Sequence, residues 1–161
     1  MKETTQPKTF GGFRCSSIMK VYTLRRKQFL PIGLQDAWSF FSRAENLARI
    51  TPDYMKFKIV HASGDGNMFP GQIIRYRLYL FPLVPWQWTT EITSVDEPYS
   101  FVDEQLSGPY AFWQHRHNFA KVDGGVEMSD EVNYAVPFGF IGRIANRLLI
   151  RRQLNRIFDY R

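Results

Sequence analysis

The residues best suited to chemistry in this 161-residue sequence are two histidines separated by one residue, His115 and His117. Side chains at positions i and i+2 of a β-strand point to the same face of the sheet. An imidazole can take up and release a proton near neutral pH, and a carboxylate can hold it in the required orientation. With His115 or His117 as the base and Asp130 as its orienting partner, the cluster would suit proton transfer to a bound carbonyl compound.

The same histidines allow a second interpretation. Two imidazoles on one strand face and one carboxylate form a common ligand set for Zn²⁺ or Fe²⁺, and Asp103 or Asp130 would supply the carboxylate. A His-x-His pair also arises often by chance, so we expect no metal and no other cofactor. We expect no catalytic nucleophile, because no Gly-x-Ser-x-Gly elbow occurs and Cys15 lies in the N-terminal stretch.

An α+β succession of elements must position these residues. Residues 20–30 alternate imperfectly and predict a first strand, and helical spacing predicts two short helices at 34–43 and 46–50. Turn signals then separate six predicted strands, which are 56–62, 71–80, 86–96, 99–107, 110–122 and 125–136. Strands joined by such short links must pair antiparallel.

Residues 138–160 predict one long C-terminal helix with an apolar stripe that includes Ile141, Ile144 and Leu148 and resumes at Leu154. Successive strands bury one face only if another element covers it, and this helix is the only predicted element long enough to do so. We therefore expect a helix-grip fold, in which a curved antiparallel sheet wraps around the C-terminal helix. The expected domain is 20–161, preceded by a poorly ordered tail at 1–19.

Alternation along the predicted strands indicates which side chains face the helix. Three neighbouring strands place Asp103, His115 and Asp130 on the concave face together with Phe101 and Trp113. Buried charge is costly unless paired, so the polar residues either satisfy one another or orient a ligand's carbonyl or hydroxyl. The predicted ligand-binding residues are Tyr76, Trp88, Phe101, Asp103, Gln105, Trp113, His115, His117, Asp130, Tyr134, Ile144 and Leu148.

Positive charge is concentrated at the two ends of the chain. The net charge is +6, to which residues 1–20 contribute +3 and residues 143–161 contribute +5, while residues 21–142 carry −2. A nucleic-acid binder more usually spreads basic residues over one surface, so we expect no nucleic-acid partner. The helix arginines are either a solvated face or a contact for anionic lipid headgroups or an acidic partner, and those concerned are Arg147, Arg151, Arg152 and Arg156.

Three further features bear on where and how the protein works. The start is polar, without a secretory h-region, and no apolar run reaches the roughly 18 residues that span a bilayer, so we expect a cytoplasmic protein. A single cysteine allows no internal disulfide. The apolar segment 78–88 is either a buried hairpin, which we favour, or an exposed rim through which a ligand or membrane is reached. We expect a monomer or weak dimer.

Several stretches of the chain resemble the SRPBCC superfamily, which comprises START-like and birch-pollen-allergen-like proteins, and the match is closest to bacterial stand-alone ligand-binding members. The resemblance covers about Val21 to Arg161. The stretches that carry it are Glu45-Asn46-Leu47, Ile50-Thr51-Pro52, Phe101 to Gln105, Gly108-Pro109-Tyr110, Trp113, His115, His117, Tyr134, Pro137-Phe138-Gly139, Arg151 to Leu154 and Ile157 to Arg161.

The resemblance implies the helix-grip fold and an internal hydrophobic cavity that binds lipids, quinones, polyketides or similar molecules. It does not imply one activity, since such relatives include carriers, cyclases, hydrolases and chaperone regulators. We therefore expect a non-catalytic binder of a hydrophobic or amphipathic small molecule. Two alternatives stay open: a polyketide-cyclase or isomerase-type enzyme that uses the Asp–His cluster, and a quinone or lipid chaperone that docks on an anionic membrane.

Overall fold

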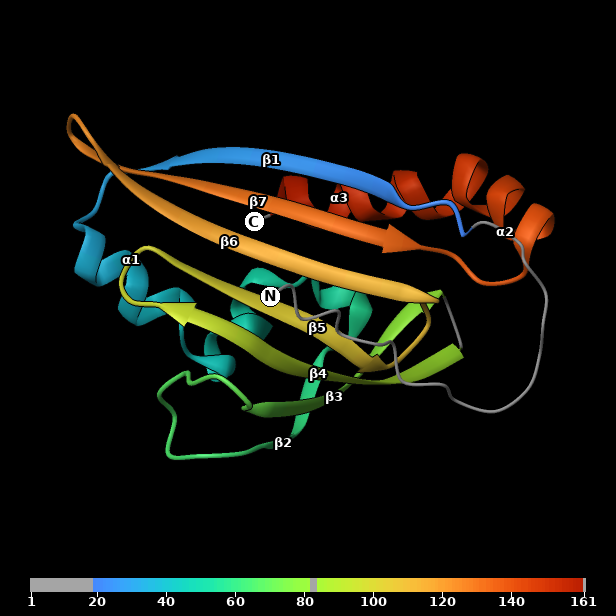
Figure 1. Ribbon diagram of the computed structural model, residues 1–161, viewed down its shortest axis with the longest axis horizontal. Helices are drawn as coiled ribbons and strands as arrows, with labels where there is room; N and C mark the ends of the chain where they lie inside the picture. Colours follow the sequence, from blue (N-terminus) through green and yellow to red (C-terminus); the bar gives the residue numbers. More distant parts are fainter. Residues whose placement is uncertain (1–18, 82–83, 161) are drawn as a thin grey trace, which may run out of the picture.

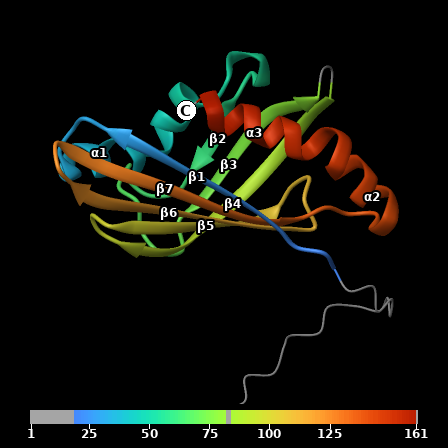
Figure 2. The same ribbon diagram turned by 90° about the horizontal axis from the view of Figure 1, so that it is seen from above.

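The computed structural model describes residues 19–81 and 84–160, which form one curved antiparallel sheet with the last helix along its concave side (Figures 1 and 2). The spatial order of the seven strands is β1-β7-β6-β5-β4-β3-β2. Every predicted strand is present, with ends that differ from the prediction by at most two residues. The strands are β1 (Tyr22–Leu30), β2 (Lys58–Ala62), β3 (Ile73–Phe81), β4 (Val84–Asp96), β5 (Ser100–Ser107), β6 (Phe112–Val122) and β7 (Gly125–Ala135).

The helices lie in two groups along the chain. After β1 come α1 (Leu34–Phe41) and two 3₁₀ segments, η1 (Ala44–Ile50) and η2 (Asp53–Met55). After β7 the chain continues through α2 (Gly139–Ala145), a π-helical segment η3 (Asn146–Ile150) and α3 (Arg151–Tyr160). The element order predicted from the sequence is therefore confirmed. The predicted N-terminal tail lies almost wholly outside the described residues.

Strict alternation in β6 and β7 builds the inner face of the sheet. In β7, Val126, Met128 and Val132 are fully buried, whereas Glu127 and Glu131 between them point outward and pair with basic residues of β1. The register sets His115 opposite Val132 and His117 opposite Asp130. The face assignment predicted from strand parity is therefore correct for the central strands.

Helix α3 ties together strands from both sides of the sheet. The Arg26 guanidinium of β1, an edge strand, donates to Asn155 Oδ1 at 2.7 Å and to Asp159 Oδ1 at 3.1 Å. The Gln153 side chain donates to the backbone carbonyl of Leu80 in β3, which is next to the opposite edge. The sheet must curve to bring both strands to one helix, and Figure 2 shows this curvature.

The first half of the C-terminal helix does not present its apolar stripe to the sheet. Ile144 is 46% exposed and Leu148 is 62% exposed, so the prediction that both face the cavity is wrong. Helix α2 projects beyond the end of the sheet (Figure 1). The residues that turn inward recur every four positions, and they are Gly142, Asn146, the half-buried Ile150, Leu154 and Phe158.

The π-helical segment explains this change of face. Residues four apart in a regular α-helix drift by about 40° per step, so a spacing of four cannot keep one face over four steps. A π-helical turn holds more residues and takes up the drift. Asn146, at the start of the π-helical segment, accepts a hydrogen bond of 3.0 Å from the Tyr134 hydroxyl of β7, which fixes that inward face.

The apolar segment 78–88 forms the ends of β3 and β4 and their connection. Leu78, Leu80 and Trp88 are buried, as the hairpin interpretation predicts, while Val84 is exposed. Residues 82 and 83 lie outside the described residues. Across the part of the chain that the structure describes, no helix is long and apolar enough to cross a membrane.

Candidate functional site

A cavity of about 130 Å³ lies between the inner face of the sheet, the 3₁₀ segment η1 and helix α3. Strands β3 to β6 provide one wall, and Leu154, Ile157 and Phe158 of α3 provide another. Ala44, Leu47 and Ile50 of η1 close a third side. Arg43, which is exposed and also lines the cavity, marks where it meets the surface.

The wall formed by the sheet is aromatic, with Trp88 at its centre. The Trp88 ring lies 5.0 Å from Trp113 in an edge-to-face arrangement, 5.4 Å from Tyr110 and 5.6 Å from Tyr76, measured between ring centroids. These are the separations at which aromatic pairs attract. The indole N–H of Trp88 is buried and has no hydrogen-bond partner among the described residues. The wall therefore offers flat apolar surface and one unsatisfied donor.

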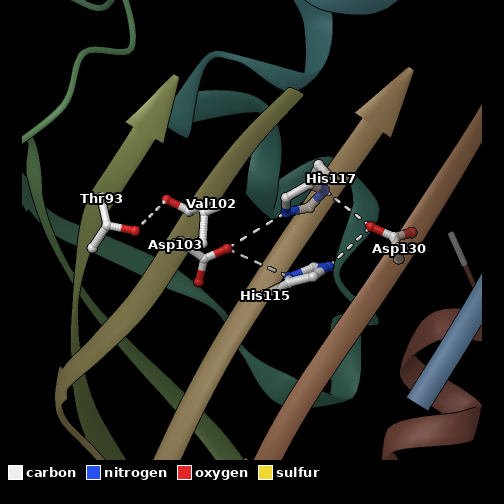
Figure 3. A network of polar contacts seen from close by, with 6 residues as sticks. All are labelled: Thr93, Val102, Asp103, His115, His117 and Asp130. Carbon is white, nitrogen blue, oxygen red and sulfur yellow. Dashed lines mark hydrogen bonds and ion pairs between the residues drawn. The ribbon is translucent and has the colours of Figure 1, made fainter. Parts of the chain in front are cut away.

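Four polar side chains, which we call the polar floor, lie at one end of this wall: Asp103, His115, His117 and Asp130 (Figure 3). They come from the neighbouring strands β5, β6 and β7. Asp130 Oδ1 lies 2.9 Å from both His115 Nε2 and His117 Nδ1. On the other side of the rings, Asp103 Oδ2 lies 3.5 Å from both His115 Nδ1 and His117 Nε2. The two imidazoles therefore bridge two carboxylates.

Stacking fixes the orientation of the two imidazole rings. His117 stacks on Phe101 with 4.1 Å between ring centroids, and its other side faces His115 at 3.8 Å. The His115 ring in turn makes an edge-to-face contact with Phe158 of α3, with 5.3 Å between ring centroids. His115, His117 and Asp130 are all buried, so their polar atoms have little access to solvent. The rings are held by packing as well as by charge.

The two histidines differ in their affinity for a proton. Burial and the neighbouring His117 lower the pKa of His115 to about 4, against the opposing effect of its hydrogen bond to Asp130. Burial also disfavours charge on His117, but Asp103 and Asp130 together outweigh it and raise the pKa of His117. Burial acts to raise the pKa of Asp130 as well, but the two histidines hold it well below its usual range. In the absence of other cations, one proton on His117 is therefore favoured over one on His115.

The structure brings together seven of the predicted ligand-binding residues as lining of the cavity: Tyr76, Trp88, Phe101, Asp103, Trp113, His115 and His117. Asp130 lies behind the histidines. Gln105 instead clamps the backbone of Tyr110, donating to its carbonyl at 2.7 Å and accepting from its N–H at 3.3 Å. Tyr134 bonds to Asn146, and Ile144 and Leu148 lie on the exposed outer face of the helix.

Sequence reasoning missed one wall of the cavity. Ala44, Leu47 and Ile50 lie in a short 3₁₀ segment whose apolar spacing is too brief to predict a buried face. Leu154 and Phe158 belong to the predicted apolar stripe of the terminal helix and could have been chosen from it. The choice between the two halves of that stripe required the position of the π-helical segment.

Comparison with known proteins supports the fold. No protein-family model and no curated protein sequence matches the chain. A solved structure of norcoclaurine synthase from Thalictrum flavum, in complex with dopamine and hydroxybenzaldehyde, matches 97% of this chain and 94% of its own, with a TM-score of 0.65 and 15% identity. The chain has the fold of norcoclaurine synthase.

Two bacterial proteins of known structure are similar to the same extent. Protein Ms6760 from Mycobacterium smegmatis matches with a TM-score of 0.62 and 16% identity over 86% of this chain and 87% of its own. TTHA0849 from Thermus thermophilus matches with a TM-score of 0.66 and 14% identity over 86% of this chain and 90% of its own. The helix-grip fold implied by the sequence resemblance is therefore confirmed. The fold alone does not determine function.

Proposed function

We propose that the protein is a member of the SRPBCC superfamily that binds an amphipathic small molecule in the cavity between the sheet and α3, without converting it. The observation that carries this proposal is the cavity itself, which combines aromatic walls with a polar floor whose histidines lie between Trp113 and Phe101. Small-molecule sites typically have this composition, in which apolar surface supplies affinity and a few polar groups fix the orientation. The apolar body of the ligand would lie against Trp88 and Trp113, with its polar group toward Asp103 and the histidines.

The size of the cavity narrows the class of ligand. An engineered cavity of about 150 Å³ is sufficient to bind benzene. The cavity here, at about 130 Å³, is comparable in size and so suits a single aromatic or quinonoid ring better than a long acyl chain or a fused polyketide. The similar fold of norcoclaurine synthase, solved with dopamine and hydroxybenzaldehyde, supports the choice, because each of those molecules is one substituted ring.

The state of the polar floor favours binding over catalysis. His115 and His117 are buried between two carboxylates, and the lowered pKa of His115 makes that residue a weak base. The pKa of His117 is raised, but its ring is packed between Phe101 and His115 and both of its nitrogen atoms lie beside carboxylate oxygens. Proton transfer is most efficient when the pKa of the catalytic group is near the working pH. The polar floor is therefore better suited to accept and orient a ligand hydroxyl or carbonyl than to move its protons.

A matched pair of substitutions in η1 tests the proposal. Ala44 lines the cavity and is buried, whereas Ala48 of the same segment is exposed. Ala44→Leu extends three further carbons into the cavity and should weaken binding of catechol or 4-hydroxybenzaldehyde at least tenfold, while Ala48→Leu should leave it unchanged. Titration calorimetry with both compounds and with a long-chain fatty acid measures this. No saturable binding of any of the three, or equal affinity in both variants, would contradict the proposal.

A second candidate function, docking on an anionic membrane surface, is favoured by the outer face of α2 and η3. This face exposes a run of large apolar side chains, which are Phe138, Phe140, Ile141, Ile144, Leu148 and Leu149. Contiguous exposed apolar surface of this kind is uncommon unless something binds there. Basic residues line a groove of about 820 Å³ between β1 and this helix, and they include Lys20, Arg143, Arg147 and Arg151.

Apolar side chains beside a cluster of cations match the chemistry of a bilayer interface. Amphipathic helices bury their apolar face at the boundary between headgroups and acyl chains, and each nearby Lys or Arg adds about 1 kcal/mol on an anionic surface. The exposed Arg152 and Arg156 extend the same positive potential along α3. We propose that α2 and η3 lie in the interface and that the groove faces the headgroups.

Vesicle sedimentation at two salt concentrations tests this docking. The protein should sediment with vesicles that contain 30% phosphatidylglycerol and not with pure phosphatidylcholine, and 0.5 M NaCl should reduce the bound fraction. Ile141→Glu with Leu148→Glu should abolish sedimentation. Val60→Glu, a control at an apolar position that is 64% exposed on β2, should not. If the double variant Ile141→Glu with Leu148→Glu still sediments, the outer face of α2 and η3 does not dock on the membrane. If instead the unmodified protein dimerises with rising concentration and this variant does not, the face binds a second copy of the chain.

A further inference from the structure

Three metal-ligating atoms of the polar floor converge on one point. Asp103 Oδ2 lies 3.5 Å from His115 Nδ1 and 3.5 Å from His117 Nε2. One ligating atom from each of the three side chains lies within 4.8 Å of the other two. Within the described ranges 19–81 and 84–160, this is the one cluster of three such side chains with that geometry. Figure 3 shows the carboxylate on one side of both rings and the nitrogen atoms turned toward it.

These separations are longer than hydrogen bonds and close to those of a metal site. An N–H···O hydrogen bond spans about 2.7–3.2 Å. Zinc binds imidazole nitrogen and carboxylate oxygen at about 2.0–2.2 Å, so two ligands of a tetrahedral ion lie about 3.4 Å apart. The measured 3.5 Å from Asp103 Oδ2 to each histidine nitrogen fits such an ion with a shift of a few tenths of an ångström.

Asp130 completes the arrangement from the other side of the rings. Its Oδ1 atom lies 2.9 Å from His115 Nε2 and 2.9 Å from His117 Nδ1. A neutral imidazole that carries its proton on the nitrogen facing Asp130 has its lone pair on the nitrogen facing Asp103. A carboxylate behind a ligating histidine is the usual second partner in metal sites, where it fixes the tautomer and the ring orientation. Here Asp130 forms a hydrogen bond with His115 Nε2 and lies at the same distance from His117 Nδ1.

We propose that Asp103 Oδ2, His115 Nδ1 and His117 Nε2 bind a divalent transition-metal ion of the Zn²⁺ or Fe²⁺ class, with Asp130 as the positioning residue. Two nitrogen ligands favour these ions over Mg²⁺ and Ca²⁺, which prefer oxygen. All three ligands line the cavity, so the remaining coordination position faces it. That an oxygen atom of the organic ligand takes this position rests on the proposed function, whereas binding of the metal alone does not.

The test uses the tag-free full chain, stripped with a chelator and titrated with Zn²⁺ alone. The sequence contains three histidines, so nitrogen NMR of the imidazole rings can follow each of them in the unmodified protein. One equivalent of Zn²⁺ should shift His115 Nδ1 and His117 Nε2 and leave the exposed His61 unchanged. This readout needs no substitution, so it stands even where a variant fails to fold.

Calorimetry on variants gives the magnitudes. His115→Gln and His117→Gln should each weaken Zn²⁺ binding at least 100-fold, and Asp130→Asn should weaken it about 10- to 100-fold, as expected of a residue behind the ligands. His61→Gln is the matched control and should bind as the unmodified chain does. Absence of saturable Zn²⁺ binding, or shifts confined to His61, would overturn the proposal. Either result would leave binding of catechol or 4-hydroxybenzaldehyde as a separate question.

Discussion

The substitution Asp130→Asn tests whether the polar floor is a buried ion pair on which the fold depends. Asp130 Oδ1 lies 2.9 Å from one nitrogen of each histidine, and together with Asp103 the carboxylate raises the pKa of His117 against the opposing effect of burial. A hydrogen bond to a charged group contributes about 1.5–3 kcal/mol, and removing one partner of a buried pair costs about 3–5 kcal/mol. Asparagine keeps one acceptor oxygen, so we expect a loss of about 2–4 kcal/mol in the free energy of unfolding.

Urea denaturation at pH 7, followed by tryptophan fluorescence and circular dichroism, measures this loss. At about 2–4 °C per kcal/mol for a chain of this size, the melting temperature should fall by roughly 4–16 °C. Glu131→Gln is the matched control, since Glu131 is the next residue of β7 and pairs with Arg25 at 2.8 Å on the exposed face. That ion pair should contribute less than about 1 kcal/mol.

The outcome can refute the reasoning in two ways. If the free energy of unfolding of Asp130→Asn is within about 0.5 kcal/mol of that of the unmodified protein, or falls no more than that of Glu131→Gln, Asp130 does not hold a buried charge. The second test combines Asp130→Asn with His117→Gln. Without the imidazole Asp130 has lost one of its two contacts, so the aspartate substitution should then cost at least about 1 kcal/mol less. Strict additivity of the two losses would show that the side chains act independently.

Three further predictions concern the elements around the cavity. Gly142→Ala should lower the free energy of unfolding by more than about 2 kcal/mol in urea denaturation, because an added Cβ would lie 1.9 Å from the backbone carbonyl oxygen of Pro137. An unchanged free energy of unfolding would show that α2 is loosely attached. Gln105→Ala removes both hydrogen bonds to the backbone of Tyr110, so it should lower the free energy of unfolding by about 1–3 kcal/mol and weaken catechol binding in calorimetry. Unchanged catechol affinity would show that these hydrogen bonds do not shape the cavity. Tyr134→Phe removes one buried hydrogen bond to the terminal helix and should lower the free energy of unfolding by about 0.5–1.5 kcal/mol. Amide hydrogens should then exchange faster in the π-helical segment than in α3, and equal exchange rates would contradict this.

The sequence by itself determined which polar residues share the concave face. Asp103, His115, His117 and Asp130 follow from strand parity, because the pleat reverses side-chain direction at every residue and the apolar neighbours mark the inner face. The predicted pairing of Asp130 with a histidine is confirmed at 2.9 Å. Antiparallel pairing of the successive strands over 56–136 was predicted from the links between them and is confirmed, whereas the position of β1 beside β7 was not predicted.

Only the tertiary structure decided how these residues are used. Equidistance of Asp103 Oδ2 from two ring nitrogens depends on ring rotation and sheet twist, which strand parity does not specify. The buried face of the terminal helix depends on a π-helical segment at Asn146–Ile150, which has no marker in the apolar spacing. Ile144 and Leu148 lie on the outer face, because the tertiary contact between Tyr134 and Asn146 sets the rotation of the helix against the sheet.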